Sequence, residues 1–463
     1  MPVSAITQDL TQGHVGRQLW TFALPFMACN CLQSFYSMVD MIVVGKYVGT
    51  ACLSAVSIGS QLTTMFMTVG LGLCTGGQVY ISQLVGAKDY KALNRVIGTM
   101  FTTIGLLALL LTAIGLLFHT PMLNAMNTPA ESMEEAVRYL VVCSWGTVFI
   151  YGYNAVCAVL RGMGDSKHPL LFVGIATIVN VVLDLLFVVV FHWGAMGAAL
   201  ATVIGQASAF LFAMFFLYRR RDSFVFDFKR ASFAIQTDKL KVFLKLGLPI
   251  TLQSNAVTFS MLFISSRANA FGLVATAVYG VGQKLYSVVS IVSASVQASA
   301  ASVVGQNMGA GRLDRVKQSV YWAWGGNLIA FIFVTAACLL FPTQIFALFD
   351  HSPEVLAMAP DYMFINIFLF LAFFLMSPTL ALINGVGFTM LNFLIGLLDG
   401  VVVRIPLCLM LCDHMGLYGI FWGNTLASYV TVLLGGAYFF SGLWKKRKSL
   451  AAPETDIQAC TDH

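Results

Sequence analysis

Three acidic residues lie in stretches that otherwise hold almost only apolar side chains: Asp40, Asp184 and Asp399. Asp184 belongs to the stretch NVVLDLLF and follows Asn180 by four residues, so a helix would present both polar side chains on one face. An ionised carboxylate in a lipid environment costs at least about 2.5–3.5 kcal/mol, so it should face protein or water, and it usually marks a functional site. What these acids can do depends on the elements that position them.

The composition places the acids in a membrane protein. Hydrophobic residues make up 58% of the 463 residues and charged residues only 10%, against about 25% charged in soluble domains. The mean hydropathy is +0.82, and residues 1–16 are too polar for a cleavable signal peptide. A span needs about 20 apolar residues, and we predict twelve: 19–44, 51–80, 96–118, 137–160, 169–191, 195–218, 243–268, 273–303, 317–341, 358–383, 389–411 and 416–443. The predicted fold is an all-α polytopic membrane protein.

The basic residues predict the orientation of these spans. If both termini are cytoplasmic, most of the 26 lysines and arginines fall in segments on the cytoplasmic side. Positively charged short loops usually stay on that side of a membrane. The exceptions are Lys46, Arg138, Arg267, Lys284 and Arg404. We therefore expect a multi-pass protein of a bacterial or archaeal cytoplasmic membrane with its N- and C-termini in the cytoplasm.

The sequence also contains an internal repeat. Gln83, Gly86 and Ala87 in the first half of the chain match Gln306, Gly309 and Ala310 in the second half. Gly162 and Gly164 match Gly385 and Gly387 at the same sequence offset. Six spans on each side of the join predict two pseudo-symmetric six-helix lobes in the same orientation. The predicted parts are an N-terminal lobe (1–218), a cytoplasmic linker (219–242), a C-terminal lobe (243–443) and a cytoplasmic tail (444–463).

The acids of the N-terminal lobe have the chemistry of a coupling-cation site. A rise of about 1.5 Å per residue places Asp40, Asp184 and Thr202 in the outer half of that lobe. A carboxyl group in a low dielectric can take up and release protons, and oxygens from two Asp, one Asn and one Thr could equally form a cage for Na⁺. The choice between H⁺ and Na⁺ stays open. A polar cluster that only holds helices together is the weaker interpretation.

The C-terminal lobe has a different set of charges. At the offset of the repeat, Asp40 and Asp184 correspond to Phe263 and Leu407, so the coupling acids are confined to one lobe. Asp399 and Arg404 are five residues apart, about 140° around an α-helix, and are not expected to pair. We instead expect Lys284 and Asp399 to form an interhelical ion pair, with structural and gating roles of Lys284, Asp399 and Arg404 both open.

Other classes of function find little support in the sequence. The ten cysteines show no zinc-binding spacing, and the histidines fall in loops or at span ends. No nucleophile–base pair is evident, so we expect no enzyme, no cofactor and no metal beyond Na⁺ at the coupling residues. The KKRK tail fits a cytoplasmic anchor, so no nucleic-acid partner is expected. The expected partners are a small drug-like substrate and membrane lipid, and the expected state is a monomer.

Several motifs together resemble the MATE family of multidrug and toxin extrusion transporters over residues 14–443: YSMVDMIVVGKYVG, SQLVGAKDY, RGMGDSKHP and GAMGAALAT, with the Asn180/Asp184 pair. The pattern is similar to the DinF-like branch, within the wider multidrug/oligosaccharide-lipid/polysaccharide exporter superfamily. The resemblance implies that Asp40, Asn180, Asp184 and Thr202 take part in coupling to H⁺ or Na⁺, and it adds Asn154. The acids that NorM-type members carry on spans 7 and 10 are missing here.

We therefore predict a secondary active multidrug efflux transporter that exports amphipathic organic cations by antiport with H⁺ or Na⁺ through alternating access. Neutralisation of the two acids would let the first helix or its neighbours shift and displace bound drug, with differential binding to two states as the energy source. The alternative is a lipid or lipid-linked oligosaccharide flippase of the same superfamily, in which Lys284, Arg404 and Arg267 would bind an anionic headgroup. That alternative leaves the N-lobe acids without a role.

Overall fold

The computed structural model describes residues 8–48, 50–220 and 226–451. Within these ranges the regular structure is entirely helical, with no strand. Among the described residues, twelve helices are long and apolar enough to cross a membrane, which confirms the predicted number of spans. A helix satisfies the backbone polar groups within one segment, and this explains why so apolar a chain takes this form.

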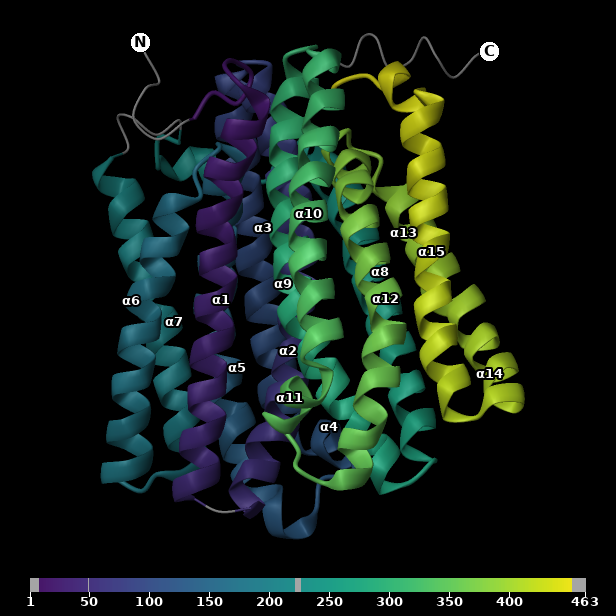
Figure 1. Ribbon diagram of the computed structural model, residues 1–463. Helices are drawn as coiled ribbons and strands as arrows, with labels where there is room; N and C mark the ends of the chain where they lie inside the picture. Colours follow the sequence, from purple (N-terminus) through teal and green to yellow (C-terminus); the bar gives the residue numbers. More distant parts are fainter. Residues whose placement is uncertain (1–7, 49, 221–225, 452–463) are drawn as a thin grey trace. The chain divides into compact units, whose positions relative to one another are not determined.

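The helices follow one another with short connections (Figure 1). The first six spans are α1 (Val15–Tyr47), α2 (Thr50–Gly86), α3 (Tyr90–Leu117), α5 (Ala130–Gly162), α6 (Lys167–Asp184) with the π-helix η1 (Leu185–Val190), and α7 (Gly194–Arg219). The last six are α8 (Thr237–Asn269), α9 (Leu273–Gly309), α10 (Leu313–Leu340), α12 (Pro353–Gly385), α13 (Thr389–Leu397) with the π-helix η3 (Leu398–Val403) and α14 (Arg404–Met415), and α15 (Leu417–Ser441). The shorter elements are α4 (His119–Ala125), α11 (Pro342–Ala347), η2 (Arg230–Phe233) and η4 (Leu443–Lys446).

Most of the helices extend beyond the predicted apolar runs. The run 51–80 lies inside α2, and α3 begins at Tyr90, six residues before its predicted run. Asp89 caps α3 by accepting a hydrogen bond from the backbone N–H of Ala92, which satisfies one of the free donors at the helix start. Apolar runs therefore mark the part of a helix that suits lipid, whereas caps and loops mark its ends.

The helix boundaries confirm the internal repeat. α9, α10 and α12 begin at one constant offset from α2, α3 and α5, and each matching pair has the same length. The short helices α4 and α11 begin at the same offset from each other. The two halves thus share not only glycines and glutamines but a common order of elements.

The chain forms two compact units whose bounds differ from those of the predicted lobes. The first unit contains Leu24–Thr251, and the second contains Leu10–Ala23 and continues from Leu252. The start of α1 therefore belongs to the second unit, and the start of α8 belongs to the first. Both changes occur next to a proline inside a helix, Pro25 in α1 and Pro249 in α8, where a backbone hydrogen bond is missing and a helix bends easily.

Close helix contacts at glycines hold the first unit together. α5 packs against α2, α3 and α7, and α6 packs against α7. A Cβ atom added to Gly76 of α2 would lie 2.5 Å from the backbone nitrogen of Gly247 in the first part of α8. At Gly70 the phenol ring of Tyr151 fills the space, and the Tyr151 hydroxyl donates a hydrogen bond to the carbonyl of Phe66 at 2.5 Å. These glycines allow the helices to approach each other closely.

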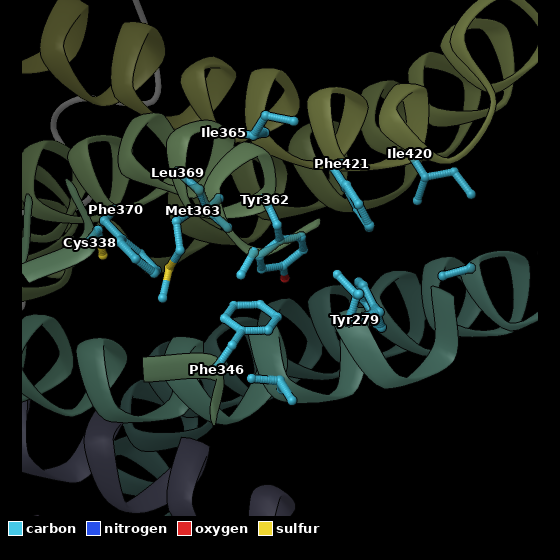
Figure 2. Packing of buried hydrophobic residues seen from close by; sticks show 14 of the residues in the cluster. Tyr279, Cys338, Phe346, Tyr362, Met363, Ile365, Leu369, Phe370, Ile420 and Phe421 are labelled. Carbon is cyan, nitrogen blue, oxygen red and sulfur yellow. The ribbon is translucent and has the colours of Figure 1, made fainter. Parts of the chain in front are cut away.

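The second unit is built around α12, which packs against α9, α10 and α15. Its core is a cluster of buried aromatic and aliphatic side chains, in which Tyr279, Phe346, Tyr362 and Phe421 gather between the helices (Figure 2). The ring centroids of Tyr362 and Phe421 lie 4.7 Å apart in an edge-to-face arrangement, and those of Phe346 and Tyr362 lie 5.8 Å apart.

Candidate cation-coupling site

One face of α6 carries a buried polar stripe in the first unit. Thr177, Asn180 and Asp184 are all buried, and their spacing of three and four residues puts them on one side of the helix. The apolar residues Ile178 and Val182 lie on the other side and are 67% and 58% exposed. α6 thus presents its lipid-soluble side chains outward and its polar ones to the protein.

The stripe meets Thr202 of α7 and Asp40 of α1. The amide nitrogen of Asn180 donates a hydrogen bond to the hydroxyl of Thr202 at 3.4 Å. α7 comes close at this level, because a Cβ atom on Gly205 would lie 3.1 Å from the Cβ of Asn180. Asp40 is buried, and Val43 and Val44, which follow it in α1, pack in one cluster with Val188, which lies one turn after Asp184. The structure therefore brings together four of the five residues predicted for the site.

The oxygen atoms of this cluster have few hydrogen-bond partners. Within the described part of the chain, neither carboxylate oxygen of Asp184 has a hydrogen-bond partner. The same holds there for Oδ1 of Asp40, Oδ1 of Asn180 and Oγ1 of Thr177. A buried polar atom without a partner costs about 1–3 kcal/mol. Oxygen atoms that converge without a basic side chain among them suit a proton or a hard cation. No group of three or more His, Cys, Asp or Glu side chains in the described ranges could hold a metal ion.

The surroundings of the two acids are apolar. Val43 and Val44 of α1, Val188 of η1 and Ala195 and Ala198 of α7 belong to one buried cluster beside them. This packing excludes water and lowers the local dielectric, which strengthens every interaction between charges at the site. A carboxylate there is stable only when a cation or a proton compensates its charge.

Three further residues of the site were missed by the sequence analysis. Thr177 belongs to the polar stripe, and the hydroxyl of Tyr36 on α1 accepts a hydrogen bond from the side-chain amide of Gln206 on α7 at 3.1 Å. Each lies one helical turn from a predicted residue, since Tyr36 precedes Asp40 by four positions and Gln206 follows Thr202 by four. A search for polar neighbours at helical spacing would have found all three.

Asn154 takes a different place. It lies on α5, and its side-chain amide donates a hydrogen bond to the carbonyl of Ile150 one turn earlier at 2.9 Å. This bond ties Asn154 to its own helix. Within the described ranges, the structure shows no hydrogen bond from it to the other four predicted residues.

The charges of the second unit are paired differently from our expectation. Arg404 Nη2 lies 2.8 Å from Asp399 Oδ1, and Asp399 Oδ2 accepts a hydrogen bond from Thr431 at 2.8 Å. The prediction that Asp399 and Arg404 do not pair was wrong because the helix is not α-helical here. η3 covers residues 398–403, and a π-helix bonds residue i to residue i+5, so residues five apart lie nearly above one another.

The predicted pair of Lys284 and Asp399 is also wrong. Asp399 is buried with Arg404, whereas Lys284 is exposed, with its Nζ 5.1 Å from the centre of the Phe349 ring. The ammonium group of Lys284 gains a cation–π contact instead of an acidic partner. The second unit thus compensates its buried acid within one helix, while no basic partner is found in the described chain for Asp184.

These features define a class of protein. Two homologous six-span repeats with a buried acidic site in one of them are typical of secondary transporters. The MatE family model matches residues 25–186 and 249–410, one match in each repeat, and the chain belongs to this family.

Curated relatives and a solved structure agree with the family. The chain is 30% identical over 457 residues to the probable multidrug resistance protein YoeA of Bacillus subtilis (strain 168), covering 96% of this chain and 97% of the relative. It is 28% identical to the probable multidrug resistance protein YpnP of the same organism, over 95% of this chain and 98% of that one. The outward-facing structure of a multidrug resistance MATE family transporter of the MOP superfamily is similar in fold, with a TM-score of 0.89 at 22% identity over 96% of this chain and all of that one.

Proposed function

We propose that the chain is a multidrug efflux transporter that exports amphipathic organic cations in exchange for H⁺ or Na⁺. Membership of the MatE family and relatives named as multidrug resistance proteins support drug export. The observation that carries the coupling is the buried pair of Asp40 and Asp184, for which no ion pair with a basic residue is found among the described ones.

Neutralisation of the acids is the chemical event of this cycle. Two carboxylates close together in a low dielectric do not both stay ionised, so the site takes up a proton or a cation from the side that it faces. Binding removes the repulsion between α1 and α6 and allows those helices to approach. A coupling ion drives export only if it binds one conformation more tightly than the other. Asn180 and Thr202 would supply further oxygens to Na⁺, or orient Asp184 for proton uptake.

The orientation is part of the proposal. The distribution of Lys and Arg supports cytoplasmic termini, and the named relatives are bacterial, which supports a bacterial or archaeal cytoplasmic membrane. The acids then lie toward the outer side of the membrane. There they would take up H⁺ or Na⁺ from the side on which both ions are commonly more abundant.

Reconstituted protein tests the coupling. Proteoliposomes that hold the full chain are given a proton gradient, a sodium gradient, or neither, and the transport of ethidium is followed together with a pH probe and a sodium probe. We expect ethidium transport with one of the two gradients and ion movement that depends on ethidium. Asp184→Asn should lower coupled transport at least about tenfold, because an amide cannot bind and release the proton and carries no charge for Na⁺.

The matched control is Asp314→Asn, which alters an exposed acid in the first turn of α10. This variant should transport like the wild type. Ethidium-dependent ion movement at wild-type level in Asp184→Asn would contradict the assignment of the site. Concentrative transport in the absence of both gradients would contradict antiport itself.

A further inference from the structure

A cavity of about 280 Å³ lies in the second unit between the end of α8, α14 and the start of α15. Its charged residues are Arg267 and Asp413, and its apolar wall includes Phe263, Ile264, Leu409 and Ile420. Drug-sized ligands usually need about 300–1,000 Å³, so this cavity suits a small polar group better than a bulky drug.

The charged residues of the cavity lie near the ends of spanning helices. Arg267 and Asp413 each stand two residues before the end of a spanning segment, at the level of the membrane–water interface. Phe263 and Leu409 precede them by four residues, so each charged side chain has an apolar side chain one turn deeper on the same face. A ligand for this cavity is therefore polar toward water and apolar toward the membrane centre.

Both charges are available to a ligand. In the described part of the chain, no ion pair joins Arg267 or Asp413 to another side chain. The guanidinium carbon of Arg267 lies 5.5 Å from the centre of the Phe263 ring, which holds the cation against the wall of the cavity. Both residues are exposed, so a ligand reaches them without any opening of the fold.

The first unit shows that the fold does not require these charges. The equivalent positions of the first repeat hold Val44 and Phe191, and Val44 is buried in the apolar cluster of that unit. The repeat thus builds the same helix ends with two apolar residues in one unit and with an acid and a base in the other. Arg267 is also one of the few basic residues on the side of the membrane predicted to be outside.

We propose that this cavity binds the headgroup of a zwitterionic phospholipid with a primary ammonium group, such as phosphatidylethanolamine. Arg267 binds the phosphate, since a guanidinium forms two parallel hydrogen bonds with such an anion. Asp413 accepts hydrogen bonds from the ammonium group, and the apolar wall contacts the glycerol region. The inference does not depend on ion coupling, and only the leaflet, the outer one, rests on the orientation proposed above.

Lipid binding to the purified full chain in detergent micelles tests this inference. Native mass spectrometry is used to compare bound dioleoyl phosphatidylethanolamine, phosphatidylcholine and phosphatidylglycerol. We expect the wild type to prefer phosphatidylethanolamine over phosphatidylcholine, whose quaternary ammonium has no hydrogen to donate. Arg267→Val should weaken the binding of both phosphatidylethanolamine and phosphatidylglycerol about fivefold, whereas Asp413→Val should weaken only the former by a similar factor.

The first unit carries an apolar residue at both positions, so these variants are expected to fold. Glu354→Gln, which changes an exposed acid in the first turn of α12, serves as the control and should bind lipid like the wild type. Equal affinity of the wild type for the three lipids, or unchanged lipid binding in Arg267→Val, would overturn the proposal. Displacement of phosphatidylethanolamine by ethidium in the wild type but not in Asp413→Val would also overturn it, because the cavity would then be a drug site.

Discussion

Replacing Asp399 by asparagine should destabilise the protein by about 3–5 kcal/mol, because it leaves the charge of Arg404 buried without a counter-ion. Both side chains are buried and their charged atoms are 2.8 Å apart. At that distance, unit charges attract by about 6 kcal/mol with an effective dielectric constant of about 20. Desolvation of the two ions offsets much of this attraction in the wild type. Asp399→Asn still has to desolvate the Arg404 guanidinium, but it has lost the attraction to the carboxylate.

The double variant Asp399→Leu, Arg404→Met separates these terms. Removing a buried pair together is often neutral, or stabilising by about 1–4 kcal/mol, since neither charge has to be desolvated. Unfolding of the purified full chain by sodium dodecyl sulfate in mixed micelles gives the free energy of unfolding for the wild type, Asp399→Asn and the double variant. Each 1.4 kcal/mol corresponds to about a tenfold change in the unfolding equilibrium.

Stability of Asp399→Asn within about 0.5 kcal/mol of the wild type would contradict this expectation, and so would a double variant less stable than Asp399→Asn. Transport by the double variant decides a second point. Wild-type transport would assign the pair a structural role, whereas loss of transport in a stable double variant would assign it a gating role.

Three other outcomes are expected. Asp184→Asn, unlike Asp399→Asn, should leave the free energy of unfolding unchanged or raise it in the same assay, because it removes a repelling charge rather than a partner. Gly76→Ala should destabilise by about 1–3 kcal/mol, since its Cβ would meet the backbone of α8 at 2.5 Å, whereas Gly105→Ala, where nothing lies within 4 Å, should stabilise by about 0.5–1 kcal/mol. The hydrogen bond from Ser232 lowers the pKa of Asp227. The folded structure of the linker around Asp227 is therefore expected to lose stability as the pH falls through that pKa. Ser232→Ala should move this loss of stability to higher pH. Hydrogen exchange of the backbone amides of Asp227 and its neighbours measures it.

The spans and the repeat could be predicted because each rests on a pattern that survives along the whole chain. An apolar run of about 20 residues has one stable form in lipid, and the recurrence of glutamines and glycines at a constant offset predicted the correspondence of α2 with α9 and of α5 with α12. The gathering of Asp40, Asn180, Asp184 and Thr202 followed from depth and helix face. Each of these arguments needs only regular helix geometry.

The pairing of Asp399 with Arg404 could not be predicted, because it depends on a departure from that geometry. A π-helix adds one residue to a turn, and nothing in the stretch LDGVVV distinguishes it from α-helix by composition. η1, which begins directly after Asp184, was missed for the same reason. Asp184 and Asp399 thus both stand at a π-helix, where an acid can be turned toward a partner or away from one, and π-helices often occur at functional sites.

The exchange of helix starts between the two units has a consequence for the gene as well as for the protein. The first half of the gene encodes residues 10–23, but these residues belong to the second unit. The second half of the gene encodes residues 237–251, but these residues belong to the first unit. A chain cut in the linker would yield two polypeptides, each of which lacks a segment that its own compact unit needs. Such reciprocal exchange is the arrangement of a domain-swapped homodimer, so fusion of two copies of one gene would preserve it. Co-expressed halves should therefore complement each other, while either half alone should fail to accumulate.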